Sequence, residues 1–103
     1  MPLYPTSSPV INFPSTSNAT PTSVTVANTS TSILAADPNR KKFTIYNPGV
    51  ATVFIEYGGT PTTTAYLTPI SPGFLFVDDL DWKGAVNGIV ATGTNALLVR
   101  SFT

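Results

Sequence analysis

The chain has 103 residues and a formal net charge of zero, with five basic and five acidic side chains, so it has the size of one small domain. It contains neither His nor Cys, which excludes disulfides, zinc fingers, Cys nucleophiles and His bases. The neutral balance argues against a nucleic-acid partner, and since no apolar run approaches the ~18 residues of a membrane span, we expect no membrane partner either.

The first 23 residues differ from the rest of the chain. They hold five of the ten prolines and no charged side chain. Because dense proline disfavours helices and central strands, we predict an extended arm over residues 1–23 and a separate body over residues 24–103. A free spacer has no use for large apolar groups, so those in the arm are the predicted contacts with a partner. They are Leu3, Tyr4, Val10, Ile11 and Phe13.

The body alternates apolar and polar residues with a period of two, which is typical of β-strands. β-Branched and aromatic residues dominate the alternating segments, as strands favour. The predicted strands lie at 24–26, 33–35, 43–46, 53–57, 74–77, 88–91 and 97–102. The unbroken apolar run at 74–77 indicates a strand that is buried on both faces.

Turn residues separate these segments at intervals of about 8–12 residues, and at most one helical turn is expected, near 78–82. We therefore predict an all-β fold, a small antiparallel β-sandwich or barrel of about seven or eight short strands with an extended N-terminal arm. A body of about 80 residues is near the lower size for independent stability. We therefore expect a homo-oligomer and prefer a trimer to a dimer.

The acidic residues that cluster in the sequence are Asp78, Asp79 and Asp81. Residues 79–84 partly match a calcium-binding loop, but a lysine and a valine stand where that loop needs acidic ligands. A turn whose carboxylates cap backbone N–H groups is the favoured interpretation. The sequence therefore predicts no metal site.

The basic cluster is Arg40, Lys41 and Lys42. Phosphate binding is one interpretation. In the favoured one, Arg40 donates to loop carbonyls and the lysines guard an exposed strand, and ion pairs across a subunit interface are a third. Trp82 either stacks on sugars together with three tyrosines or, as we favour, packs over a core edge or interface. Arg40 and Trp82 are thus candidates for an interface or loop-organising role.

Catalytic motifs are missing from the sequence. Ser and Thr hydroxyls are plentiful, but a hydroxyl nucleophile needs an activating base, and there is neither a His nor a Ser-x-x-Lys spacing. Nucleotide-binding glycine motifs are missing as well. We therefore predict that the protein is not an enzyme and has no cofactor.

Residues 33–47 read Ile-Leu-Ala-Ala-Asp-Pro-Asn-Arg-Lys-Lys-Phe-Thr-Ile-Tyr-Asn. This stretch resembles one that recurs in small β-domain virion proteins of tailed bacteriophages, in which an Ala-x-Pro-Asn-Arg-Lys turn leads into a strand ending in Asn. A short strand like 53–58 follows, then a Pro-Gly turn with an aromatic strand, here 72–74, and a Gly-Ala-Val step, here 84–86. The resemblance covers residues 33–103 and leaves the arm outside.

The resemblance implies a protein associated with a phage capsid. We expect a cement, or decoration, protein on the outer capsid surface of the virion, whose partner is the major capsid protein and which stabilises the shell by bridging capsid subunits. The alternative is a head-fibre, neck or tail module that binds a host surface glycan.

Overall fold

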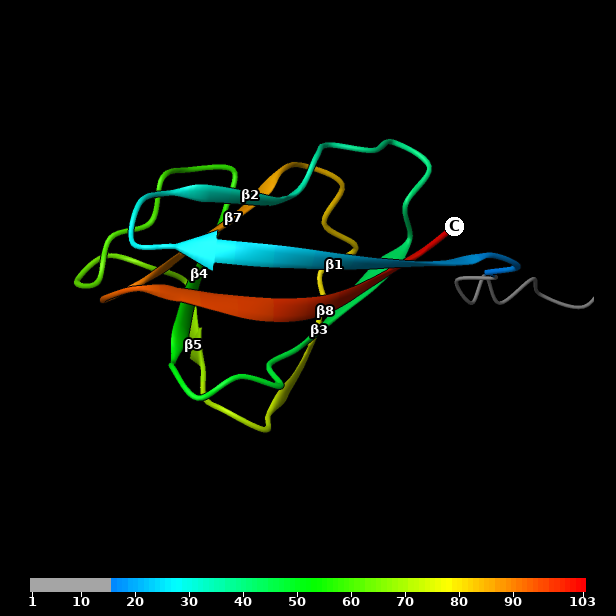
Figure 1. Ribbon diagram of the computed structural model, residues 1–103. Coiled ribbons are helices and arrows are strands. Elements are labelled where there is room, and N and C mark those ends of the chain that lie inside the picture. Colours follow the sequence, from blue (N-terminus) through cyan, green and yellow to red (C-terminus); the bar gives the residue numbers. More distant parts are fainter. Residues whose placement is uncertain (1–15) are drawn as a thin grey trace, which may run out of the picture.

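The computed structural model describes residues 16–103, which form two four-stranded antiparallel sheets packed face to face (Figure 1). Sheet A has the order β1 (Ala19–Ala27), β8 (Thr94–Phe102), β3 (Lys42–Tyr46), β6 (Leu75–Val77). Sheet B has the order β2 (Thr31–Leu34), β7 (Val86–Val90), β4 (Val53–Tyr57), β5 (Thr68–Ile70). The predicted all-β fold is confirmed, and its two open sheets make it a sandwich. No helix in the described part has the length and hydropathy to cross a membrane.

The core lies between the two sheets, where alternate residues of each strand point inward. Residues of β8 alternate strictly between exposed and buried from Thr94 to Arg100, as a strand with one face on the core does. Each buried aliphatic side chain contributes about 1.5–3 kcal/mol. The buried apolar residues are Val26, Ile33, Phe43, Ile45, Val53, Ile55, Ile70, Val86, Val90, Leu97 and Val99.

One glycine is required by this packing. Gly88 lies in the middle of β7 and is buried, and a Cβ there would come within 2.6 Å of Ile33 Cδ1 and 3.5 Å of Val53 Cγ1. The missing side chain is therefore what lets Ile33 of β2 cover the centre of sheet B.

The seven predicted strand segments each overlap an observed strand, and β5 is the strand that the sequence pattern did not predict. It has three residues with a proline at its centre, and it pairs only with β4. Proline is tolerated there because β5 is an edge strand and needs hydrogen bonds on one side alone.

The predicted arm of residues 1–23 extends too far, because β1 begins at Ala19 and Ala19–Ser23 pair with β8. The pairing continues beyond the strand: Asn18 and Thr103 exchange both backbone hydrogen bonds, at 3.2 and 3.0 Å. Since bonded and non-bonded pairs alternate along an antiparallel ladder, Pro21 falls at a non-bonded position. Its missing N–H therefore faces the free edge of sheet A, and the strand tolerates it.

The prediction that 74–77 is buried on both faces is wrong. β6 is the other edge strand of sheet A, and Leu75 and Val77 are exposed while Phe76 is half-buried. The run is apolar on both faces because its outward residues belong to an apolar surface that no other segment of residues 16–103 covers.

Candidate functional site

Arg40 joins the loops at one end of the sandwich. It is 1% exposed, and its guanidinium donates to Ala35 O at 3.0 Å, to Trp82 O at 3.2 and 3.0 Å, and to Gly84 O at 2.6 Å. Its planar fork of donors suits several carbonyl acceptors at once. The ring of Phe43 lies 5.3 Å from the guanidinium carbon, within cation–π range. The guanidinium is thus turned inward, away from any external phosphate.

Asp78 accepts further hydrogen bonds among the loops at the same end of the sandwich. Its carboxylate is fully buried and accepts hydrogen bonds from the Tyr57 hydroxyl at 2.7 Å, Leu80 N at 3.2 Å and Trp82 N at 3.0 Å. Asp79 and Asp81, by contrast, are exposed. The three carboxylates therefore do not converge, and residues 16–103 contain no group of acidic side chains able to hold a metal ion.

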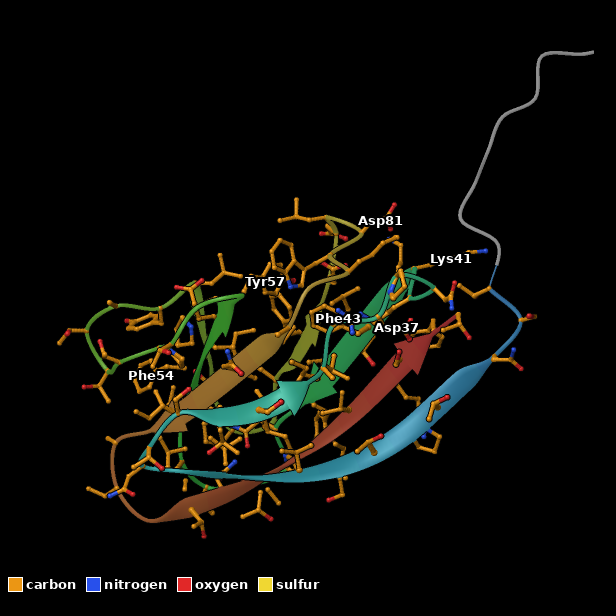
Figure 2. All side chains as sticks on the ribbon, turned by 90° about the horizontal axis from the view of Figure 1, so that it is seen from above. Asp37, Lys41, Phe43, Phe54, Tyr57 and Asp81 are labelled. Atoms are coloured by element: carbon orange, nitrogen blue, oxygen red, sulfur yellow. The ribbon has the colours of Figure 1, made fainter. Side chains whose placement is uncertain are left out.

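Trp82 is half-buried and completes this loop cluster. Its ring stacks on Tyr57 with centroids 5.0 Å apart and planes inclined by 12°, and its Nε1 donates to Ala85 O at 2.9 Å. Gly84 lies under the indole, where a Cβ would come within 2.6 Å of Cζ2. In Figure 2, Asp37, Lys41 and Asp81 are labelled toward this end of the body and Phe54 toward the other, with Tyr57 between them.

The Tyr57 hydroxyl is the titrating group whose environment is most clearly perturbed. Burial raises the pKa of Tyr57 far above its usual value near 10, and the hydrogen bond to the Asp78 carboxylate raises the pKa further. Tyr57 is therefore a hydrogen-bond donor under ordinary conditions and part of the loop cluster rather than an acid–base group.

The four aromatic side chains considered for a sugar-stacking platform do not gather. Trp82 and Tyr57 stack on each other, whereas Tyr66 packs on Phe54 of sheet B with centroids 4.6 Å apart. Tyr46 is on a third surface, the outer face of sheet A.

A second polar network closes the opposite end of the sandwich. Asn47 is fully buried and donates to Ala51 O and Ile70 O, both at 2.8 Å. Its Oδ1 accepts from Asn95 Nδ2 at 2.8 Å. This network links the end of β3 to the start of β8 and to β5, and every buried side-chain N or O atom of the described residues has a partner.

The outer face of sheet A holds an open groove, which the sequence pattern did not predict. We call it the outer groove, and the residues that define it here are Ser23, Thr44, Tyr46, Leu75, Leu98 and Arg100. Register aligns Ser23, Leu98, Tyr46 and Leu75 in one row across the four strands. Tyr46, Leu98 and Leu75 are 38%, 50% and 58% exposed. The sequence signal for this groove is that Tyr46 and Leu98 are apolar at strand positions where the alternation predicts polar residues.

The predicted site residues therefore fall into three groups. Arg40 and Trp82 meet in the loop cluster. Lys42 is separated from Arg40 and points outward on β3, opposite to the buried Phe43. The arm contacts Leu3, Tyr4, Val10, Ile11 and Phe13 lie outside the described residues.

Comparison of the chain with protein-family models, curated proteins and solved structures finds no match.

Proposed function

We propose that this protein is a non-enzymatic virion component, a cement protein that binds the outer surface of a phage capsid. The body sits over a junction between major capsid subunits, and the N-terminal arm extends across neighbouring subunits and inserts apolar side chains into their grooves. The resemblance of residues 33–103 to small phage virion proteins supports the assignment to a capsid.

The observation that carries the proposal is the way the arm is attached. An uncharged arm with five large apolar side chains leads directly into β1, and all nine residues of β1 pair with β8. From Ser17 onward the chain is thus tied to the longest ladder of the sandwich. A firm attachment of this kind suits a protein that holds two partners together.

The energies favour many weak attachments. Burying one apolar side chain contributes about 1.5–3 kcal/mol, while ordering each arm residue costs about 1–2 kcal/mol, less where proline already restricts the chain. The net gain per arm is therefore modest. A shell that carries many copies sums these gains.

The test is the addition of purified protein to capsids that lack it, followed by quantification of bound protein and localisation on the shell by electron microscopy. We expect binding at junctions between capsid subunits. A chain shortened to residues 16–103 should keep its β spectrum and bind more weakly, and Leu3→Ser/Tyr4→Ser should weaken binding in part. Full-strength binding by the shortened chain would refute the role of the arm, and no binding by the full chain would refute the cement function.

A further inference from the structure

The two sheets differ in what covers their outer faces. On sheet B, the outward Phe54 is half-buried beneath Tyr66 of the loop at 58–67, with ring centroids 4.6 Å apart. On sheet A, no described segment plays this part, and Tyr46, Leu75 and Leu98 stay exposed in the outer groove. Exposed apolar side chains that gather in one patch mark an interaction site.

We propose that residues 10–13 of the N-terminal arm of a second copy of the chain occupy the outer groove. The segment reads Val-Ile-Asn-Phe and carries no charge, as the apolar row of the groove requires. Ile11 and Phe13 are two residues apart, so an extended segment presents them on one side about 7 Å apart. The row from Leu98 through Tyr46 to Leu75 crosses three strands and is about 10 Å long, which accommodates both side chains.

The reach of the chain selects a second copy over the same molecule. Ser17 N and Asn18 N both donate to Thr103 O, at 2.9 and 3.2 Å, so Thr16 lies at the end of sheet A beside the C-terminus. The row of the groove begins at Ser23, seven residues after Thr16 and about 20 Å from it along the strand. Even a fully extended chain takes residue 13 only about 10 Å and residue 11 about 17 Å from Thr16, so Ile11 and Phe13 fall short of the groove of their own molecule.

Length and symmetry agree with this arrangement. The fifteen residues before Thr16 span up to about 50 Å when extended, so Leu3 and Tyr4 remain available beyond the groove for the shell. A contact between an arm and a groove joins two different surfaces, and such a contact forms a ring when its rotation closes and an open filament when it does not. The ring we expect has three copies, with every arm and every groove in use. This assembly takes place in the free protein and does not depend on capsid binding.

The first experiment uses the absence of cysteine from the chain. Ile11→Cys, on the side of the segment that faces the groove, and Ser23→Cys are introduced together, and the oxidised protein is separated on a denaturing gel without reductant. We expect covalent dimers and trimers, and a mixed disulfide when the two single variants are combined. Ile11→Cys with Thr63→Cys, on the exposed loop at 58–67, is the matched control and should stay monomeric. A disulfide confined within one chain, or none in excess of the control, would overturn the proposal.

The second experiment measures the mass of the full chain by sedimentation across a range of concentrations. Leu98→Ser/Tyr46→Ser removes apolar surface from the groove and should raise the concentration needed for assembly about tenfold or more. Leu80→Ser/Val50→Ser, at exposed apolar loop positions outside the groove, should leave assembly unchanged. Far-UV circular dichroism verifies that both variants fold, and equal assembly by the two would contradict the inference. Leu3→Ser/Tyr4→Ser should assemble normally, which separates this result from that of capsid binding.

Discussion

Arg40 donates four hydrogen bonds to three carbonyl oxygens, and those carbonyls belong to two segments that are more than forty residues apart in the chain. A lysine at this position offers a single point donor and cannot reach all three. We expect Arg40→Lys to lower the free energy of unfolding by about 3 kcal/mol, because buried carbonyls lose their donors. Urea denaturation followed by tryptophan fluorescence measures the loss.

Arg100→Lys is the matched control for Arg40→Lys. Arg100 is exposed on the outer face of β8, where a conservative substitution changes stability by less than about 0.5 kcal/mol. Equal effects of the two substitutions would mean that the carbonyl contacts of Arg40 contribute nothing specific.

Tyr57 makes stability depend on pH on the alkaline side. Its pKa is raised by burial and by Asp78, so the folded state holds the proton more tightly than the unfolded state does. The contribution of Tyr57 is therefore complete below about pH 10 and is lost as the pH rises toward the folded-state pKa. We expect the free energy of unfolding to fall above about pH 10.

Comparison with Tyr57→Phe isolates that effect from the lysines, which titrate in the same range. The substituted protein should be less stable at neutral pH, because Asp78 loses a donor, and its stability should vary less between about pH 9 and 11. An identical pH dependence in both proteins would rule out Tyr57 as the source.

The sequence indicated Arg40 and Trp82 as candidates for an interface or loop-organising role, but it left their contacts open. Arg40 is one of three consecutive basic residues, and the sequence does not show which of the three points inward. That depends on where β3 begins. The acceptors of Arg40 are backbone carbonyls, which carry no sequence signal. Asp78 belongs to a cluster of three aspartates in the sequence. It is the buried one of the three because it directly follows β6.

The corrected start of β1 leads to a test at the scale of elements. A chain that begins at residue 16 keeps the whole β1–β8 ladder, whereas a chain that begins at residue 24 loses five of the nine residues of β1. We expect the first to melt like the full-length protein and the second to melt several degrees lower, about 4–8 °C for each kcal/mol lost. Differential scanning calorimetry checks both, and equal melting of the two would contradict the pairing of Ala19–Ser23.

Gly88 tests the contact between β2 and β7. In Gly88→Ala, the new methyl group meets Ile33 Cδ1 at 2.6 Å, so the Ile33 side chain must shift and the free energy of unfolding should fall by about 1–3 kcal/mol. Gly59→Ala is the control, because its nearest neighbour there is Glu56 Cγ at 3.6 Å. Chemical denaturation compares the two, and an unchanged Gly88→Ala protein would show that sheet B has room at this point.

Strand periodicity identified the elements whose two faces differ, such as β3, β4 and β8. It failed at edges. Pro21 and Pro69 stand in edge strands, and proline was counted against strands although an edge needs hydrogen bonds on one side only. The apolar run of β6 was assigned to the interior because periodicity does not distinguish a second buried face from an exposed apolar one.

For the whole molecule, the dependence of attachment on salt is the simplest test of the arm. The arm has no charged side chain, so its contacts are not screened by ions. We expect capsid binding to change little between about 0.05 and 0.5 M salt. Measurement of bound protein at each ionic strength checks this, and a steep fall would mean that charged residues of the body carry the attachment instead.

The fold class followed from the sequence because turns and alternation extend over the whole body. The outer groove did not, because it exists only through the register that aligns Leu98, Tyr46 and Leu75 from three strands far apart in the chain. No local pattern records that alignment.

The continuous ladder between β1 and β8 also has a mechanical consequence. β1 and β8 lie side by side along the sandwich (Figure 1), paired from Ala19 with Phe102 to Ala27 with Thr94. Tension applied through the arm runs along the axis of β1, and the ladder hydrogen bonds lie perpendicular to it. The bonds are therefore loaded in shear and share the force, instead of opening one after another as in a peeled strand. In the proposed role on a capsid, swelling of the shell would therefore load the β1–β8 ladder in shear.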